Sequence, residues 1–255
     1  MDSLISVNII TKNEENNIAE CIDSVAWADE IIVVDSGSTD RTEELCRRDK
    51  VKFFFNKWEG FAPQRAFALN KSNGDWVFVI DADERVTPEL KDEVVKTVSQ
   101  NDANFNGYKI ARRSYCLGKW VKHNGWYPGY QMRLFRKSST RVADRLVHEG
   151  YEVSGNTGIL NSDFLHYTLE NIEQFMTKVN RCAILQAIEK EGRKKVGFSD
   201  IFLHPLATFI RGFIFKKGFL DGTAGLIIAY FDVITNMLTY MNLYQLQKKS
   251  KSKTG

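Results

Sequence analysis

The sequence has few cysteines, and they lie far apart. Its 255 residues include only Cys21, Cys46, Cys116 and Cys182, with no C-x-x-C pair and no histidine at the spacing of a zinc site. This pattern argues against a disulfide-stabilised secreted module and against a zinc ribbon. It indicates reduced thiols, as in a cytosolic protein.

A large excess of charge is also absent. The 35 Lys and Arg residues against 32 Asp and Glu give a net charge of +3, which is too small to indicate a nucleic acid partner. The first residues lack the charged, then apolar, then small-residue order of a signal peptide. A hydrophobic content of 43% and a charged content of 26% are ordinary for a folded protein. The length suits one large domain, or one domain with an appendage.

Glycine-rich phosphate loops are missing as well. No G-x-G-x-x-G follows the first predicted strand, and no G-x-x-x-x-G-K-[ST] occurs anywhere in the chain. A nucleotide would therefore have to be held by side chains and a metal ion instead of a backbone cradle.

One short stretch, residues 76–84, combines a buried strand with a group of acids. W-V-F-V-I is apolar without polar alternation, which is typical of a strand buried on both faces. Asp81, Asp83 and Glu84 follow at once. Two carboxylates one residue apart can bind one hard cation, Mg²⁺ or Mn²⁺, whose other ligands come from substrate phosphates. The alternative is a solvated acidic turn.

Strands and helices alternate through the first hundred residues. Short apolar runs predict strands at residues 4–10, 30–34, 51–55 and 76–80, with helices between them and after Pro88. This order predicts an α/β domain with a parallel sheet. Ligands bind beyond the carboxyl ends of such strands. The polar segments 11–14, 35–40 and 81–84 are therefore expected to converge there.

Three motifs in this half carry a resemblance to a known family. I-I-T-K-N-E-E-N-N-I, V-V-D-S-G-S-T-D and D-A-D-E, in this order over residues 4–84, resemble the inverting family 2 glycosyltransferases. The resemblance implies the GT-A nucleotide-diphospho-sugar transferase fold, a mostly parallel central sheet flanked by helices. Ser36 stands where many members have a second aspartate, which leaves open which carboxylate reads the base. Asp40 is interpreted as a helix cap.

The resemblance also implies site residues. Nucleotide contacts are expected from the first two loops, the following helix and the acidic turn: Thr11, Glu14, Asp35, Arg65 and Asp81. Metal ligands for Mg²⁺ or Mn²⁺ are expected at Asp83, Asp81 and His166. His166 has the alternative of an ordinary packed histidine.

The pattern changes after Gly107. Strands are predicted at residues 108–115, 130–136 and 141–153, and the loop 118–129 is aromatic and basic. That loop is interpreted either as a platform for sugar rings or as a surface loop with a packed tryptophan.

Two segments make the resemblance to family 2 glycosyltransferases more specific. They are W-Y-P-G-Y-Q-M-R-L-F-R (residues 126–136) and R-L-V-H-E (residues 145–149). They resemble the bacterial lipopolysaccharide-core glucosyltransferases. This implies UDP-glucose as donor, an inner-core sugar as acceptor, and acceptor contacts at Trp126, Tyr127, Arg133 and His148.

Inverting transfer needs a base to take the proton of the acceptor hydroxyl. The family places it in the acceptor half, and by position Glu149 is the candidate. An ion pair of Glu149 with Arg145 or Arg133 is the alternative, and Glu84 and Asp144 are reserve candidates for the base.

The last third of the chain predicts helices at residues 171–191, 201–215 and 222–245. The final helix has membrane-span length, but a polar stripe interrupts it at Asp232, Thr235, Asn236, Thr239 and Asn242. Burying that aspartate in lipid is costly. We therefore expect an amphipathic helix at the membrane surface, followed by a disordered basic tail. A hairpin packed on the catalytic domain, or a homodimer contact, is the alternative.

These features together predict three segments. Residues 1–168 form the catalytic domain (1–100 nucleotide-sugar half, 101–168 acceptor half), 169–247 a helical extension that associates with membrane or dimerises, and 248–255 the tail. The predicted protein is cytoplasmic and peripheral on the inner face of the cytoplasmic membrane. It moves glucose from UDP-glucose to a lipid-linked or lipopolysaccharide glycan. A polyprenyl-phosphate sugar transferase and a non-catalytic membrane-binding scaffold are the alternatives. A nucleotidyltransferase is disfavoured because the first loop lacks glycines.

Overall fold

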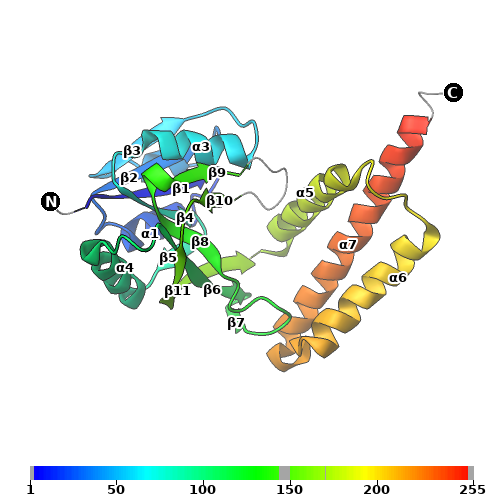
Figure 1. Ribbon diagram of the computed structural model, residues 1–255. Helices are drawn as coiled ribbons and strands as arrows, with labels where there is room; N and C mark the ends of the chain where they lie inside the picture. The colour runs from blue at the N-terminus through cyan, green and yellow to red at the C-terminus, as the bar shows by residue number, and fades with distance from the viewer. Residues whose placement is uncertain (1–2, 144–149, 170, 252–255) are drawn as a thin grey trace. The chain divides into compact units, whose positions relative to one another are not determined.

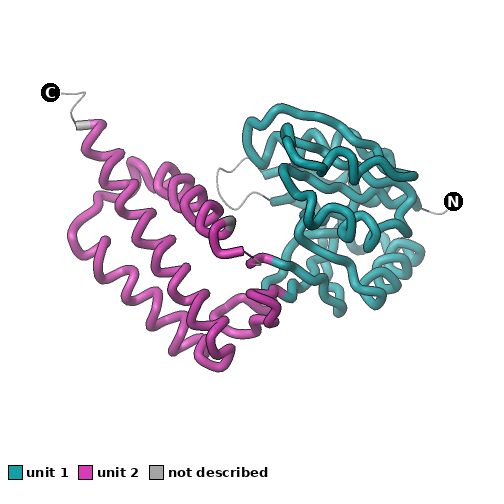
Figure 2. The backbone as a smooth tube through the Cα atoms, turned by 180° about the vertical axis from the view of Figure 1, so that it is seen from behind, with its two compact units in different colours: residues 1–113, 129–167 teal, residues 114–128, 168–255 magenta. Residues whose placement is uncertain are grey.

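The computed structural model describes residues 3–143, 150–169 and 171–251 (Figure 1). The chain divides into two compact units. Unit 1 comprises residues 1–113 and 129–167, and unit 2 comprises residues 114–128 and 168–255 (Figure 2). Residues 118–128 of the aromatic loop thus belong to unit 2 with the helices, and only Gly129 belongs to unit 1.

Unit 1 is built on a mixed sheet with the strand order β3-β2-β1-β4-β8-β6-β11-β5. The first four neighbours are parallel: β3 (Val51–Phe55), β2 (Glu30–Asp35), β1 (Ile5–Thr11) and β4 (Trp76–Asp81). The others are β8 (Gln131–Arg136), β6 (Gly107–Cys116), β11 (Thr157–Leu169) and β5 (Glu84–Val86). Antiparallel pairing joins β4 to β8, β8 to β6, and β11 to β5. The expected parallel sheet is therefore confirmed for the first four strands, and the acceptor half adds antiparallel ones.

Both faces of the parallel strands are covered, which is why their sequences are continuously apolar. In β2, Ile31 and Val33 belong to the core cluster that contains α1 (Ile18–Ser24). Ile32 and Val34 face the other way, into the cluster with Ala68 of α3 (Phe61–Lys71). The remaining helices of unit 1 are α2 (Thr42–Leu45) and α4 (Pro88–Gln100), with a 3₁₀ turn at Lys137–Ser139.

Strand register brings the predicted loops to one edge. Thr11 pairs with Asp35 across β1 and β2, and Ile10 pairs with Asp81 across β1 and β4. The three strands therefore end together, as expected. The strand predicted over residues 141–153 is described as β9 (Thr140–Val142) and β10 (Tyr151–Val153), which pair antiparallel. Residues 144–149 lie outside the described part.

Unit 2 contains β7 (Lys119–Val121), the ends of β6 and β11, and helices that pack on a separate apolar cluster, which includes Val121, Ile228 and Phe231. Its helices are α5 (Ile172–Lys190), α6 (Phe198–Phe209), the π-helical turn η2 (Ile210–Phe215), the 3₁₀ turn η3 (Gly218–Asp221) and α7 (Gly222–Lys251).

Helix α7 is longer than expected. It continues through Lys251, so the prediction of a disordered tail from Lys248 is wrong for residues 248–251. This end contains lysine, glutamine and leucine, which favour helix, and no glycine or proline. The Lys248 ammonium also lies 5.1 Å from the Tyr244 ring centre, one turn earlier.

Two segments of unit 2 are long and apolar enough to cross a membrane, by length and composition alone. These are Phe198–Phe215 and Gly218–Ser250, of whose apolar windows 17% and 39% are buried. Core helices of soluble proteins pass the same test, so this finding is weak evidence by itself.

Candidate active site

The D-A-D-E segment forms a tight turn between β4 and β5 at the convergent strand ends. The Glu84 carboxylate accepts the N–H of Asp81 at 2.8 Å, and the carbonyl of Asp83 accepts the N–H of Tyr167 from β11 at 2.9 Å. His166 pairs with Glu84 in the β11–β5 register. The turn is therefore held from both sides, and its carboxylates have defined positions.

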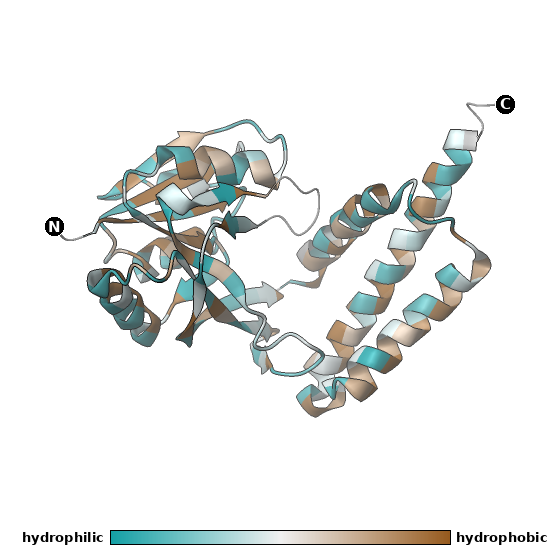
Figure 3. Cartoon of the chain, viewed as in Figure 1, coloured by the Kyte–Doolittle hydropathy of each residue, from teal (hydrophilic) through white to brown (hydrophobic). Residues whose placement is uncertain are grey.

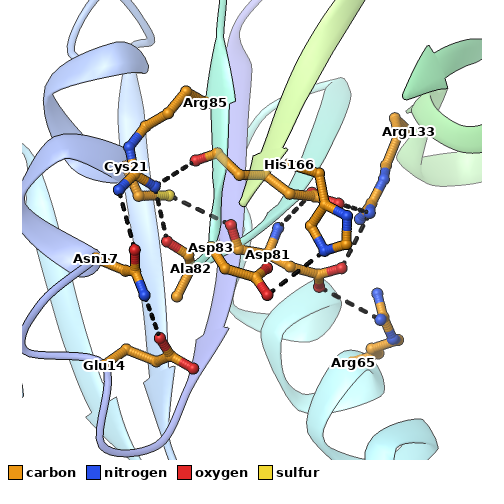
Figure 4. A network of polar contacts seen from close by, with 11 residues as sticks. Glu14, Asn17, Cys21, Arg65, Asp81, Ala82, Asp83, Arg85, Arg133 and His166 are labelled. Atoms are coloured by element: carbon orange, nitrogen blue, oxygen red, sulfur yellow. Dashed lines mark hydrogen bonds and ion pairs between the residues drawn. The ribbon is translucent and has the colours of Figure 1, made fainter. Parts of the chain in front are cut away.

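Asp81 lies between two arginines (Figure 4). Arg133 donates to one carboxylate oxygen at 3.0 Å, and Arg65 of α3 donates to the other at 3.4 Å. Burial alone would raise the pKa of Asp81, but the two guanidinium groups lower it to about 2. Asp81 is therefore ionised at neutral pH, with a guanidinium group at each of its oxygens.

Glu84 is fully buried, with 0% of its surface exposed. It accepts from Arg133 at 2.6 Å. Burial raises its pKa to about 8, with Arg133 opposing and Asp81 and Asp83 adding to the rise. As a reserve candidate for the base it is poorly placed, because its oxygens hold Arg133 and the backbone of Asp81.

Asp83 and His166 face each other, with 3.5 Å between Oδ2 and Nε2 (Figure 4). Adjacent ligands of an octahedral Mg²⁺ with bonds of about 2.1 Å lie roughly 3 Å apart, so one cation could bind both. Among the described residues, no group of three or more His, Cys, Asp or Glu side chains could hold a metal ion. Asp83 and His166 could supply two ligands of an open site that phosphate oxygens would complete, while the Asp81 oxygens accept from Arg133 and Arg65.

The two loops expected to hold the nucleoside are locked together. The backbone N–H of Asn13 donates to Ser38 Oγ at 2.7 Å, and that of Glu14 donates to Thr42 Oγ1 at 2.8 Å. The Glu14 carboxylate accepts from Asn17 at 3.0 Å. The hydrogen bonds between the two loops hold them in fixed positions at this edge of the sheet.

Thr11 and Asp35 differ in how they are satisfied. The Thr11 hydroxyl is buried without a hydrogen-bond partner in the described part of the chain, as a group awaiting a ligand would be. Asp35 instead accepts the N–H groups of Gly37 and Ser38, both at 2.7 Å. Ser36, the departure from the family motif, accepts from Gln64 at 3.2 Å.

Arg85 was not singled out from the sequence, although it directly follows D-A-D-E. Its guanidinium donates to the carbonyls of Ala82 at 3.0 Å and Glu84 at 2.8 Å (Figure 4). It also lies 3.3 Å from the Glu20 carboxylate. It therefore ties the acidic turn to α1. Tyr151 was also missed. Its ring lies 5.8 Å from the Arg65 guanidinium, and no local pattern indicates this contact.

The residues expected to bind the acceptor are placed differently. Arg133 is 5% exposed and bonds Asp81 and Glu84, so its guanidinium is held among the carboxylates of the acidic turn, and its expected acceptor contact stays a prediction. Trp126 packs against the core of unit 2, and Tyr127 lies edge-on to Trp120 at 5.4 Å.

Four further residues named from the sequence lie outside the described part of the chain. They are the expected base Glu149, the expected acceptor contact His148, and Asp144 and Arg145.

Comparisons with known proteins agree with the motifs. The model of the family "Glycosyl transferase family 2" matches residues 6–168. "Lipopolysaccharide core biosynthesis glycosyltransferase LpsC" of Rhizobium meliloti is 30% identical over 249 residues, covering 94% of this chain and 92% of that protein. An uncharacterized glycosyltransferase of Rickettsia typhi is also 30% identical, covering 97% and 89%. Among solved structures, S. aureus TarS residues 1–349 match with a TM-score of 0.46 and 16% identity over 98% of this chain and 92% of that one.

Proposed function

This chain is a glycosyltransferase of family 2, and on that premise we propose that it moves glucose from UDP-glucose to a hydroxyl of the lipopolysaccharide inner core. The observation that carries the proposal is the convergence of Asp81 and Asp83 with Thr11 at one sheet edge, beside Arg65 and Arg133. The similarity to a lipopolysaccharide-core enzyme over nearly the whole chain supports the acceptor class.

The proposed roles follow from the contacts. Thr11, Glu14 and Asp35 line the nucleoside end, and Arg65 and Arg133 keep Asp81 ionised and oriented. When bound at Asp83 with Asp81 and His166, Mg²⁺ or Mn²⁺ supplies Lewis-acid neutralisation of the leaving diphosphate.

Glu149 takes the proton of the acceptor hydroxyl in this proposal. The acceptor oxygen attacks the anomeric carbon from the face opposite the diphosphate, which inverts the configuration.

Calorimetric titration with UDP, with and without Mn²⁺, tests the donor site. UDP should bind when Mn²⁺ is present and much more weakly when it is absent, because two carboxylates repel an uncompensated diphosphate. ADP serves as the matched nucleotide. Absence of UDP binding with every divalent cation tested would overturn the assignment.

Replacing the proposed base, Glu149→Gln, should lower kcat for a hydroxyl acceptor by about 10²- to 10⁴-fold. UDP binding should not change. Glu152→Gln is the matched control, since Glu152 forms an exposed ion pair with Arg141. A polyprenyl phosphate is already an anion and needs no base. Full activity of Glu149→Gln would therefore favour that acceptor over the glycan.

We also propose that unit 2 lies on the inner face of the cytoplasmic membrane. Exposed large apolar side chains follow one another through α6, η2 and η3, where Figure 3 shows much hydrophobic colour: Phe198, Phe202, Leu203, Leu206, Ile214, Phe215, Phe219 and Leu220. Arg211, Lys216 and Lys217 lie in the same stretch of chain. Apolar side chains with adjacent cations suit an interface rich in anionic lipid.

Phe202→Glu with Leu206→Glu should reduce flotation with anionic vesicles by roughly tenfold or more, because each lost apolar contact costs about 1.5–3 kcal/mol. Val95→Glu, at an exposed apolar position on α4, is the control. If flotation persists while a dimer detected by sedimentation is lost, these side chains form a subunit interface instead.

A further inference from the structure

A polar pocket of about 250 Å³ lies inside unit 2, among α5, α6, η2 and α7. All of its lining residues except Asn124 lie outside the segment that the family model matches. Its wall includes most of the polar stripe noted on the last predicted helix, namely Asp232, Thr235 and Asn236. The stripe therefore faces a cavity within this unit.

Two cations stand at the ends of the π-helical turn. Arg211 and Lys216 line the pocket, are exposed, and form no ion pair with any carboxylate of residues 3–143, 150–169 or 171–251. The backbone N–H of Lys216 donates to the carbonyl of Arg211 at 2.8 Å, and the Lys216 carbonyl accepts from Asn124 at 3.0 Å. The turn thus holds both positive charges beside one cavity. Single π-helical turns of this kind often occur at functional sites.

The remaining wall includes several hydrogen-bond acceptors. The Thr208 hydroxyl donates to the carbonyl of His204 at 2.9 Å, and the Thr235 hydroxyl donates to the carbonyl of Phe231 at 2.7 Å. Only their oxygen lone pairs remain for another group. The Asn236 side-chain oxygen is buried without a partner in the described chain.

Asp232 adds a further acceptor. One of its carboxylate oxygens accepts from Asn124 at 2.9 Å. Burial raises the pKa of Asp232, and the hydrogen bond from Asn124 and the charges of Lys216 and Arg211 oppose the rise. The cavity therefore has a cationic side and an acceptor side.

We propose that this pocket binds a phosphorylated polyol. The phosphate lies against Arg211 and Lys216, where charge-assisted hydrogen bonds are strongest. The hydroxyls donate to Asn236, Thr208 and Thr235. A buried, unpaired amide oxygen is costly in an apolar core, and a ligand hydroxyl would relieve that cost. The volume is just below the usual range for drug-sized ligands, so one small sugar phosphate or one lipid headgroup fits.

Calorimetry on the full chain tests whether the ligand is a soluble sugar phosphate. Glucose 6-phosphate is the probe, with glucose and inorganic phosphate beside it. Glucose 6-phosphate should bind most tightly, and Arg211→Gln or Lys216→Gln should weaken it by roughly tenfold or more. Lys217→Asn, which removes a neighbouring charge that does not line the pocket, should change nothing. Asparagine suits the left-handed φ of 58° at that position.

Flotation with phosphatidylcholine vesicles, with and without phosphatidylglycerol, tests the lipid source. A gain on adding phosphatidylglycerol that falls much further in Arg211→Gln and Lys216→Gln than in Lys217→Asn assigns the site to a headgroup, and an equal fall in all three variants would mean that the cations act only as surface charges. Melting temperatures and UDP titration, which reports on unit 1, show that the variants are folded. Equal binding of inorganic phosphate and glucose 6-phosphate would overturn the polyol assignment. The proposed site would be wrong if neither glucose 6-phosphate nor phosphatidylglycerol vesicles bound. It would also be wrong if Arg211→Gln and Lys216→Gln both left binding unchanged.

Discussion

Asp83→Ala should lower sugar transfer by at least about 10²- to 10³-fold, comparable to the loss of one strong transition-state contact. It should also abolish the dependence of UDP binding on Mn²⁺. Asp81 cannot replace it as the principal ligand, because Arg133 and Arg65 occupy its two oxygens. Asp83 Oδ2 lies instead 3.5 Å from His166 Nε2.

Transfer rates and UDP titrations with Mn²⁺ measure this effect. Asp83→Asn keeps the size of the side chain but removes the charge, and it should fall nearly as far as alanine. Asp92→Ala, at an exposed position of α4, is the matched control. His166→Gln should cost less, about 10- to 100-fold in metal affinity. An Asp83→Ala enzyme with unchanged Mn²⁺ dependence would place the cation elsewhere.

At about pH 9, where Glu84 is ionised in the wild type, Arg133→Met should lower the free energy of unfolding by about 3–5 kcal/mol, because it removes the cation that pairs with this buried carboxylate. Arg133 is the cation bonded to fully buried Glu84, at 2.6 Å, and it also bonds Asp81 at 3.0 Å. At roughly 2–4 °C per kcal/mol for a domain of this size, the melting temperature should fall by about 6–20 °C. Transfer should be lost as well, since Asp81 loses its closer arginine.

A double-mutant cycle separates this charge effect from simple loss of packing. Glu84→Gln in the Arg133→Met background should recover part of the stability, because no buried carboxylate then lacks its cation. Arg136→Met on the same strand removes a guanidinium stacked on Trp76 at 4.5 Å, and it should cost only about 0.5–1 kcal/mol. Equal losses in Arg133→Met and Arg136→Met, measured by denaturant unfolding, would contradict the account.

Much of the candidate site follows from local sequence. The strands ending at Thr11, Asp35 and Asp81 were found because continuous apolar runs and abrupt polar ends are short-range signals. Parallel pairing then makes their convergence nearly obligatory.

The acceptor half is less predictable for a physical reason. Arg133 was expected to meet an acceptor, yet it bonds a carboxylate 52 residues earlier in the chain. Tyr151 approaches Arg65 from β10, and nothing near either residue in the sequence indicates the contact. Antiparallel pairing of β4 with β8 creates this neighbourhood, and such pairing depends on the whole sheet.

The C-terminal third was also only partly predictable from the sequence. Residue spacing predicted the helices and the polar stripe of α7. It did not predict the residue at which α7 ends, because lysine-rich helix ends form or lose helix at a small cost in free energy.

The sequence by itself determined the family, the parallel strands and the acidic turn, because each depends on residues that are neighbours along the chain or repeat at a short period. Only the tertiary structure decided which arginines accompany Asp81, that Glu84 is buried, and that the stripe of α7 lines a pocket with Arg211 and Lys216. Those features require charged side chains from distant segments to lie close together where little water reaches them. Their interaction energy depends on tertiary packing, which no local sequence pattern specifies.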